Sequence, residues 1–283
     1  MTMTLISVSE LAERLKAEDV RVFDVRHDLV DHAAGRLAYQ QGHIPGARHL
    51  DHETELAAPR TGNNGRHPLP AKASLAALMA AHGVGPGTLV VAYDASGGMY
   101  AAHLWWMLRW LGHERVAVLD GGWQAWTAGG LPVSTQPETA SQAGSAAAYQ
   151  APLAESVDAQ AVLANLSQPA FTVVDARAAN RYRGEVEPMD PVAGHIPGAL
   201  NRPNGENLQA DGRFKAANQL RAEFSTLLGT QDPRSVVHQC GSGITACHNL
   251  LAMEIAGLPG SRLYPGSWSE WCSDPQRPVA RGA

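Results

Sequence analysis

Short apolar runs alternate with amphipathic stretches along most of the chain, and this alternation predicts the secondary structure. Residues 88–93 (Thr-Leu-Val-Val-Ala-Tyr) and 116–119 (Val-Ala-Val-Leu) are too short and too rich in valine for helices, so they predict buried strands. Between them, residues 99–111 carry apolar side chains at helical spacing and run into Gly112, which suits a left-handed helix cap. Strand, helix and strand in this order predict a mostly parallel sheet flanked by helices.

The pattern occurs twice along the chain. Four short segments recur in the same order, at an offset of roughly 145 to 152 residues. Each pair shares its residue types, as in the segment Gly-His-Ile-Pro-Gly-Ala, which is identical in both copies. The pairs are 7–8 with 156–157, 22–26 with 173–177, 42–47 with 194–199, and 121–126 with 266–271.

The duplication predicts two tandem domains. Residues 135–150 are rich in Ser, Gln, Ala, Thr and Gly, a composition typical of a connection between domains. We therefore expect an N-terminal α/β domain over residues 1–135, a linker over 136–152 and a C-terminal α/β domain over 153–283. A chain of 283 residues is long enough for two domains of about 100 to 150 residues each.

Composition and charge narrow the class of protein. A formal net charge of -5 and a sequence pI near 6.2 give no indication of nucleic-acid binding. The first 16 residues lack the basic flank and apolar run of a secretory signal, and no stretch is long and apolar enough to cross a bilayer. The cysteines are odd in number and fit no common zinc spacing, which favours free thiols, no metal and a cytoplasmic protein. They are Cys240, Cys247 and Cys272.

One cysteine lies where a parallel sheet places its ligands. Residues 236–239 predict a buried strand that ends at Cys240, and Gly241 and Gly243 allow a tight turn before a helix that begins near Thr245. Ligands bind at the carboxyl ends of parallel strands, and the N-terminus of a helix adds positive potential there. This position favours the nucleophilic thiolate form of cysteine. Cys247 and Cys272 are as readily explained as small buried residues.

The two copies differ at this position. The helical patterns of residues 99–111 and 244–256 each run into a glycine, and superposing them sets Asp94 opposite Cys240. Only the second copy therefore has the thiol, and we expect it to be the catalytic domain.

The chain resembles the rhodanese superfamily over nearly its whole length. The resemblance rests on the tandem arrangement, the two Gly-His-Ile-Pro-Gly-Ala segments and the loop Cys-Gly-Ser-Gly-Ile-Thr-Ala at residues 240–246. Within the superfamily the loop is most similar to that of the 3-mercaptopyruvate sulfurtransferases, Cys-Gly-Ser-Gly-Val-Thr-Ala. Rhodaneses specific for thiosulfate typically have basic residues directly after the cysteine, where this chain has Gly241 and Ser242.

The resemblance implies a ping-pong sulfur transfer without a metal or organic cofactor. The Cys240 thiolate takes the outer sulfur of a small donor, and the loop residues Gly241, Gly243, Ile244 and Thr245 bind the substrate and the resulting persulfide. The sulfur then passes to a thiol, such as thioredoxin or a small thiol, or to cyanide. With 3-mercaptopyruvate as donor, the other product is pyruvate.

A donor that carries a carboxylate needs a cation, and arginine binds such groups with two parallel hydrogen bonds. Arg181 matches an active-site arginine of the family, and Asp175, six residues earlier, is expected to orient it. The mercaptopyruvate enzymes usually have a second substrate-binding arginine a few residues later, where this chain has Met189. Arg183 is a partial substitute by position. Thiosulfate therefore stays open as the donor.

The resemblance also implies a polar relay beside the nucleophile. Ser242 corresponds to a serine that works with an aspartate and a histidine of the N-terminal half, for which Asp51 and His67 are the candidates. Such a relay would polarise Ser242 or protonate the departing enolate. An exposed loop histidine is the alternative for His67. Tyr100 falls at a substrate-pocket position of the family.

Other conspicuous residues have a structural explanation. His43 and His195 lie in a motif that both copies share, although only one copy has the thiol, so we expect packed histidines whose rings bond to the backbone. The tryptophans are expected to pack helices rather than form a ligand cage. They are Trp105, Trp106, Trp110, Trp123, Trp126, Trp268 and Trp271.

Two other classes of protein compete with a sulfurtransferase. Phosphatases with a related cysteine loop need an arginine six residues after the cysteine, where this chain has Ala246, so that class is disfavoured. A non-enzymatic persulfide carrier is the second alternative. The carrier is disfavoured because Arg181, Asp51 and His67 are expected to line a small-molecule pocket at the interface of the two domains.

Overall fold

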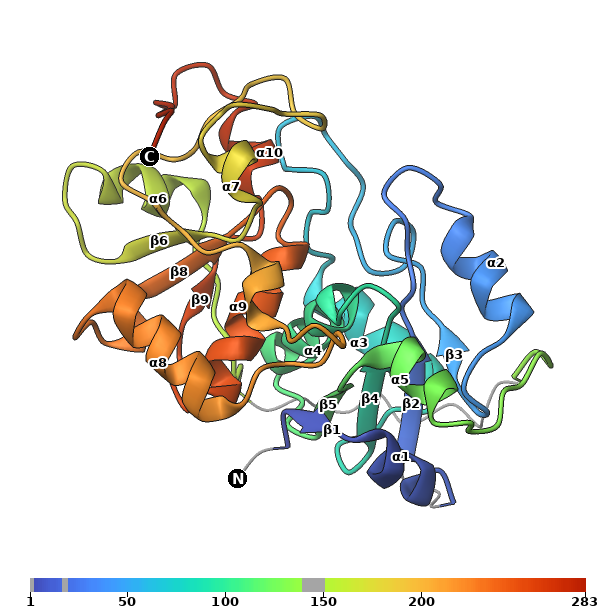
Figure 1. Cartoon of the computed structure of the whole chain (residues 1–283). Helices are drawn as coiled ribbons and strands as arrows, with labels where there is room; N and C mark the ends of the chain where they lie inside the picture. The colour runs from blue at the N-terminus through green and yellow to red at the C-terminus, as the bar shows by residue number, and fades with distance from the viewer. Residues whose placement is uncertain (1–2, 17–19, 139–150) are drawn as a thin grey trace. The chain divides into compact units, whose positions relative to one another are not determined.

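A computed structural model describes residues 3–16, 20–138 and 151–283 (Figure 1). The predicted linker, residues 136–152, lies mostly outside the described residues. The chain divides into two compact units, and the boundary is interleaved because a short segment of each half joins the other unit. The first unit comprises Met1–Ala58, Leu69–Leu153 and Ala210–Arg213, and the second comprises Pro59–Pro68, Ala154–Gln209 and Phe214–Ala283.

The sheet of the first unit has five strands among the described residues, in the order β1-β5-β4-β2-β3 (Figure 1). All of these neighbours pair in parallel. The strands are β1 (Leu5–Ile6), β2 (Val20–Asp24), β3 (Arg48–His49), β4 (Leu89–Tyr93) and β5 (Val116–Leu119). The helices are α1 (Val8–Arg14), α2 (Ala34–Gln41), α3 (Lys72–Ala81), α4 (Met99–Leu111) and α5 (Gly122–Ala128).

The second unit repeats this plan with four parallel strands among its described residues, in the order β7-β6-β8-β9. The strands are β6 (Thr172–Asp175), β7 (Leu200–Asn201), β8 (Val236–Gln239) and β9 (Arg262–Leu263). The α-helices are α6 (Ala159–Asn165), α7 (Ala179–Tyr182), α8 (Ala217–Leu228), α9 (Ile244–Ile255) and α10 (Ser267–Trp271), and two short 3₁₀ helices are η1 (Asn204–Asn207) and η2 (Pro233–Ser235). The predicted α/β architecture of parallel sheets flanked by helices is confirmed.

Helices cover both faces of each sheet, which explains why the central strands are apolar throughout. In β4, Leu89, Val91 and Tyr93 belong to the same core as Leu11 of α1 and Trp126 of α5. Side chains alternate along a strand, so the other residues of β4 face the opposite side, where α4 packs. All five residues of β4 are buried, as expected for a strand covered on both faces.

The two helices that follow the central strands are buried around most of their circumference. Ten residues of α4 and nine of α9 are buried. The predicted cap at Gly112 is confirmed, because this glycine ends α4 with a φ of 102°. A helix that is buried on all sides is held in place by the elements around it. The loop that leads into its N-terminus is therefore attached to a fixed element.

The histidines of the repeated Gly-His-Ile-Pro-Gly-Ala motif are structural, as predicted. The Nδ1 atom of His43 lies 2.8 Å from the carbonyl oxygen of Tyr39, and its ring stacks on the Tyr39 ring. His195 repeats both contacts with Tyr182, with the same Nδ1 to oxygen distance of 2.8 Å. Because the histidine–tyrosine contact also occurs in the copy without the thiol, we attribute it to the fold and not to the reaction.

The tryptophans of α5 and α10 also repeat one role. Trp126 and Trp271 are buried, and their indole N–H groups donate to the carbonyl oxygens of Pro132 and Pro278, each at 2.9 Å. These contacts agree with the expected packing role.

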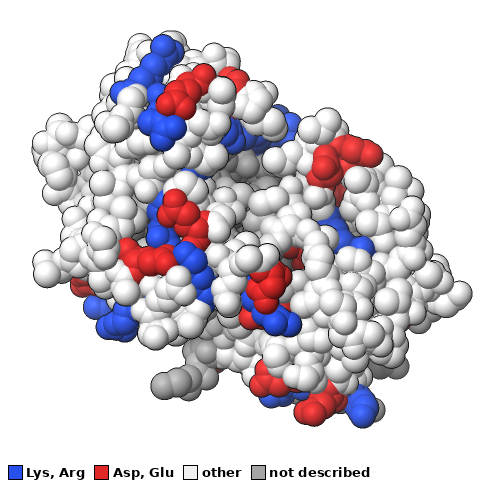
Figure 2. Space-filling model, in the orientation of Figure 1, with Lys and Arg blue, Asp and Glu red and all other residues white. Residues whose placement is uncertain are grey.

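Acidic and basic side chains lie next to one another in small groups on the face drawn in Figure 2. This intermixing fits the small net charge of -5. Among the described residues, no helix has both the length and the apolar character that a membrane span needs.

Candidate active site

The loop from Cys240 to Gly243 connects the end of β8 to the start of α9 in the second unit. Gly243 precedes α9 with a φ of 90°, a conformation that L side chains rarely adopt. A Cβ atom on Gly243 would also lie 2.5 Å from the carbonyl oxygen of Pro265. This position therefore requires glycine, and the turn that it makes aims the loop backbone at the Cys240 sulfur.

Hydrogen bonds fix the backbone of Cys240 at both its N–H group and its carbonyl oxygen. Its backbone N–H donates to Oγ of Ser267 at 3.0 Å, and its carbonyl oxygen accepts from the Trp268 N–H at 3.0 Å. Its Sγ atom accepts the N–H of Gly243 at 3.2 Å, and the residue is 1% exposed. A sulfur that accepts an amide at the N-terminus of a helix lies in a field that stabilises negative charge. This placement suits a thiolate nucleophile.

The other two cysteines lack such an environment. Cys247 is fully buried in α9, and its S–H donates to the Gly243 carbonyl at 3.3 Å. Burial raises the pKa of Cys247 well above its ordinary value, and the nearby Cys240 adds to the rise. Burial, with the charge of Asp190, raises the pKa of Cys272 to about 11. Both thiols stay protonated at neutral pH, which fits the structural interpretation of these residues.

Two guanidinium groups meet at Gly241. If Gly241 carried a Cβ atom, that atom would lie 2.8 Å from Nη2 of Arg66 and 3.7 Å from both terminal nitrogens of Arg181. Glycine at this position therefore lets both cations approach the backbone next to the nucleophile. Arg66 belongs to the segment Pro59–Pro68 of the second unit, and its backbone N–H donates to Oγ of Ser269 at 3.0 Å.

Acidic residues hold these guanidinium groups in place. Nη2 of Arg181 donates to Glu187 at 2.5 Å and lies 3.6 Å from Asp190, and Nη1 of Arg66 donates to Asp190. Burial works to raise the pKa of Glu187, but the hydrogen bond and charge of Arg181, the Met189 N–H and the charge of Arg177 lower it overall. Glu187 is therefore ionised at neutral pH and positions Arg181 through a charge-assisted hydrogen bond.

Asp175 does not orient Arg181, and this part of the prediction is wrong. Its carboxylate pairs with Arg177, which donates from Nε and Nη2 at 3.0 and 2.6 Å to Oδ2. Asp175 ends β6 and Arg177 follows it by only two residues, whereas Arg181 lies in α7 and reaches Glu187 instead. Asp175 therefore supports Arg177.

The pairing of Asp175 with Arg177 recurs in the first unit. Arg26 donates to Asp24 in the same way. Each arginine also donates to the carbonyl of the first glycine of the Gly-His-Ile-Pro-Gly-Ala motif, Gly42 at 2.6 Å and Gly194 at 2.7 Å. Both pairs are buried. A pair that is present in the copy without the thiol stabilises the fold rather than the reaction.

His67 and Ser242 form a buried polar pair. Nδ1 of His67 lies 2.8 Å from Oγ of Ser242, and the two residues are 3% and 7% exposed. The alternative of an exposed loop histidine is therefore wrong. Both residues belong to the second unit, because His67 is part of the segment Pro59–Pro68.

Asp51 and Tyr100 belong to the first unit. Oδ1 of Asp51 accepts the backbone N–H groups of Glu53 and Thr54 at 2.8 and 3.0 Å; burial works to raise its pKa, but these bonds lower it overall. Tyr100 is buried in the first turn of α4, where its ring contacts the rings of His27 and His52. The relay through Asp51 and the substrate contact of Tyr100 remain predictions.

Sequence reasoning did not single out Arg66, whose guanidinium lies at Gly241. Arg183, the expected partial substitute for the arginine missing at Met189, pairs with a surface carboxylate instead. Arg183 donates to Glu185 at 2.7 Å, and both side chains are exposed. Met189 contributes its backbone N–H to Glu187 at 3.0 Å. The only available signal for Arg66 was its place directly before His67, which fixes it in the same short segment.

Comparison with known proteins finds the same family in both halves of the chain. The family model described as the rhodanese-like domain matches residues 7–129 and again residues 158–274. A Pseudomonas aeruginosa protein named "Probable 3-mercaptopyruvate sulfurtransferase" is 48% identical over 280 residues, covering 98% of both chains. The thiosulfate sulfurtransferase of Bos taurus is 34% identical over 278 residues, covering 94% of this chain and 91% of its own.

A solved structure agrees with these relatives. The 3-mercaptopyruvate sulfurtransferase from Leishmania major superposes with a TM-score of 0.84 at 30% identity, covering 95% of this chain and 74% of its own. The chain belongs to the rhodanese family. It is a sulfurtransferase with two tandem rhodanese-like domains, of which the second has the loop cysteine.

Proposed function

We propose that the protein moves sulfane sulfur from 3-mercaptopyruvate to a thiol or cyanide acceptor through a persulfide on Cys240. The observation that carries this proposal is the position of the Cys240 sulfur, which accepts the Gly243 N–H at 3.2 Å at the start of α9. In the first half-reaction the Cys240 thiolate forms a bond to the donor sulfur. The carbon–sulfur bond of the donor breaks, its electron pair leaves as the enolate of pyruvate, and protonation of the enolate carbon completes the product.

The second half-reaction restores the enzyme. An acceptor thiolate attacks the outer sulfur of the persulfide, the sulfur–sulfur bond breaks, and Cys240 leaves as a thiolate. We infer that the acceptor is thioredoxin, a small thiol or cyanide, and that the reaction takes place in the cytoplasm. No metal or organic cofactor is needed for this sequence, because sulfur is carried on the protein itself.

The pair of His67 and Ser242 is assigned to the proton that the enolate requires. Ser242 lies two residues after Cys240, and its Oγ atom is 2.8 Å from Nδ1 of His67. A hydroxyl hydrogen-bonded to an imidazole can polarise the donor carbonyl or pass on a proton, and such groups contribute about 10²–10⁴-fold to a rate. Asp51 remains the proposed third member of the relay.

The carboxylate of the donor is assigned to Arg181 and Arg66. Both guanidinium groups lie at Gly241, directly beside the nucleophile, and Nε of Arg66 is buried without a hydrogen-bond partner among the described residues. The backbone around Gly241, Gly243, Ile244 and Thr245 is assigned to the persulfide and the donor oxygens. The first N–H groups of a helix have no partner within the helix and are suited to this task.

Thiosulfate is the second candidate donor. Two guanidinium groups also suit the sulfonate end of thiosulfate, and one relative is named for that substrate. Comparison of kcat/KM for the two donors with one acceptor tests the assignment. We expect mercaptopyruvate to be preferred by more than about tenfold, since the His67 and Ser242 pair assists only a leaving group that takes up a proton. A preference for thiosulfate by orders of magnitude would contradict this assignment.

The same kinetics test the carrier alternative. A persulfide carrier would be loaded once and would turn over poorly with either small donor. Repeated turnover with mercaptopyruvate as the only sulfur source supports an enzyme.

A further inference from the structure

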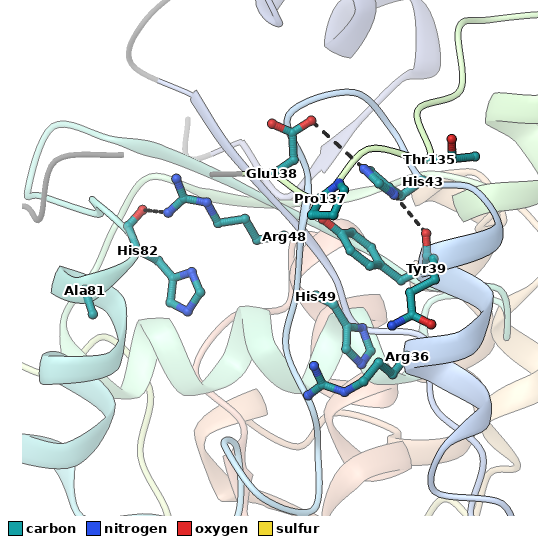
Figure 3. A pocket seen from close by; sticks show the side chains of 11 residues that line it. Arg36, Tyr39, His43, Arg48, His49, Ala81, His82, Thr135, Pro137 and Glu138 are labelled. Atoms are coloured by element: carbon teal, nitrogen blue, oxygen red, sulfur yellow. Dashed lines mark hydrogen bonds and ion pairs between the residues drawn. The ribbon is translucent and has the colours of Figure 1, made fainter. Parts of the chain in front are cut away.

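A cavity of about 350 Å³ lies in the first unit, formed by α2, β3, the end of α3 and the segment that follows α5 (Figure 3). Its lining is predominantly basic: Arg36, Arg48, His49 and His82 face one carboxylate, that of Glu138. Figure 3 shows that the two arginines and Glu138 come from three different segments around the cavity. None of these residues has a part in the proposed sulfur transfer.

The second unit lacks every one of these basic groups. Tyr39 and Tyr182 are equivalent, since each stacks on the motif histidine, so Arg36 corresponds to Ala179 by helical position. β3 pairs with β2 in the same register in which β7 pairs with β6. The helices before the two central strands, α3 and α8, have His82 and Gly229 as their C-terminal capping residues. The remaining correspondences are Arg48 with Leu200, His49 with Asn201 and His82 with Gly229.

The rhodanese-like fold of the second unit forms without these basic side chains, although Nη1 of Arg48 donates to the His82 carbonyl at 2.9 Å in the first. One of these positions makes the same contact in both copies. Nδ1 of His49 lies 3.1 Å from the Asp24 carbonyl oxygen, and the equivalent Asn201 donates to the Asp175 carbonyl at 2.9 Å. A small amide meets this need as well as an imidazole does. This shared contact therefore does not account for the cationic and imidazole groups that line the cavity of the first unit.

The cavity offers both donors and acceptors. Burial and the charge of Arg36 lower the pKa of His49, and burial and the charge of Arg48 lower the pKa of His82, so both rings are neutral at pH 7. Nδ1 of His82 is buried without a hydrogen-bond partner among the described residues. Arg36 is exposed and forms no ion pair among them. A neutral imidazole can accept a hydrogen bond, whereas a guanidinium can only donate.

Glu138 adds a second acceptor. Its Oε1 atom accepts the Gly46 N–H at 2.8 Å and lies 4.0 Å from Nε2 of His43, which has no hydrogen-bond partner among the described residues. A ligand in this cavity therefore meets cationic donors on Arg36 and Arg48 and acceptors on neutral imidazoles and a carboxylate.

We propose that this cavity binds inorganic phosphate as its monohydrogen anion. The unprotonated oxygens accept from Arg36 and Arg48, and arginine is well suited to phosphate because its fork of N–H groups matches two oxygens. The remaining O–H donates to an imidazole or to Glu138. Sulfate has the same shape and charge but no O–H, so it leaves these acceptors unpaired and meets the Glu138 carboxylate without a compensating bond.

Isothermal titration of the full-length protein with inorganic phosphate and with sulfate, at pH 7 and equal ionic strength, tests the proposal. We expect one phosphate per chain with a dissociation constant below about 1 mM, and sulfate at least about tenfold weaker. Absence of phosphate binding at 10 mM, which is about tenfold above that limit, would overturn the proposal. Equal affinity for sulfate would do the same.

Variants locate the site. Arg36→Gln and Arg48→Gln should each weaken phosphate binding about tenfold or more, the usual effect of losing a charge-assisted hydrogen bond. Arg213→Gln removes the same charge from the first unit outside this cavity and should change the affinity less than about twofold. Unchanged sulfur transfer shows that each variant is folded. Equal weakening in all three variants would indicate a nonspecific charge effect and reject the site.

Discussion

Asp94 and Cys240 occupy the same place in the two copies of the fold. Each directly follows the central strand of its sheet, one residue after the strand position that pairs with Asp24 or Asp175. The carbonyl oxygen of Asp94 accepts the Trp123 N–H at 2.8 Å, and that of Cys240 accepts the Trp268 N–H at 3.0 Å. The duplication thus has one loop with a carboxylate and one loop with a thiol.

The carboxylate shows what this loop can bind. Asp94 is fully buried and accepts backbone N–H groups from Ser96, Gly98, Tyr100 and Ala101 at 2.8 to 2.9 Å. Loop and first-turn amides therefore converge on a carboxyl group at this position of the fold, and they oppose the rise in the pKa of Asp94 that burial causes. In the second copy the shorter Cys240 side chain accepts the Gly243 N–H. We infer that the outer sulfur of a persulfide takes the place that the Asp94 carboxylate oxygens fill in the first copy.

Asp94→Ala should destabilise the first unit by about 3 kcal/mol, because several buried N–H groups lose their acceptor at once. Urea unfolding followed by tryptophan fluorescence measures the change. Asp28→Ala is a matched control, since Asp28 accepts two backbone N–H groups on the exposed surface. A loss no greater than that of the control would show that the Asp94 cradle contributes little to stability.

Replacing Arg66 or Arg181 with Gln should raise the KM for mercaptopyruvate about tenfold or more, because each loss removes a charge-assisted bond to the donor carboxylate. Arg183→Gln removes the charge of a neighbouring exposed arginine and should leave KM unchanged. Steady-state kinetics at fixed acceptor concentration distinguish the three variants. A normal KM in Arg66→Gln would remove Arg66 from the donor site.

Ser242→Ala and His67→Asn should lower kcat with mercaptopyruvate by about 10²-fold or more, because the enolate loses its proton source. The same variants should lose much less activity with thiosulfate, whose departing sulfite needs no proton on carbon. The ratio of the two losses is the measurement. Equal losses with both donors would indicate that the pair shapes the loop instead of serving the leaving group.

Glu223 gives a pH-dependent contribution to stability. Burial works to raise its pKa, but hydrogen bonds from Arg202, Lys215 and Gln219 lower it from 4.5 to about 2. Because folding lowers this pKa, ionised Glu223 stabilises the fold at pH values above its ordinary pKa of 4.5. This contribution is lost as the pH falls from about 4.5 to about 2. Glu223→Gln should therefore cost about 1 kcal/mol at pH 7, after allowance for solvent screening, and close to nothing near pH 2. Unfolding curves that differ equally at both pH values would contradict this.

The repeated architecture was predictable because its signals are local. The valine-rich segment of β8 and the glycines after it specify a strand, a turn and a helix within a few residues, so the place of Cys240 followed directly. The equivalence of Asp94 and Cys240 followed from the duplicated helices in the same way. Binary patterning and turn glycines act over the distances that a sequence displays.

The partners of the charged side chains were less predictable. Asp175 was assigned to Arg181, but Arg177 is nearer in the sequence and donates to both carboxylate oxygens. Arg66 reaches Gly241 from a segment 175 positions earlier in the sequence. Such contacts depend on tertiary placement, and a long charged side chain gives no sequence signal for which of several partners it will meet.

Mass spectrometry of the intact protein after donor treatment tests the central claim, that sulfur passes through Cys240. The wild-type protein, Cys247→Ser and Cys272→Ser should each gain the mass of one sulfur atom with mercaptopyruvate and lose it on addition of cyanide. Cys240→Ser should gain no sulfur and show no transfer. Sulfur uptake or continued turnover in Cys240→Ser would contradict the account.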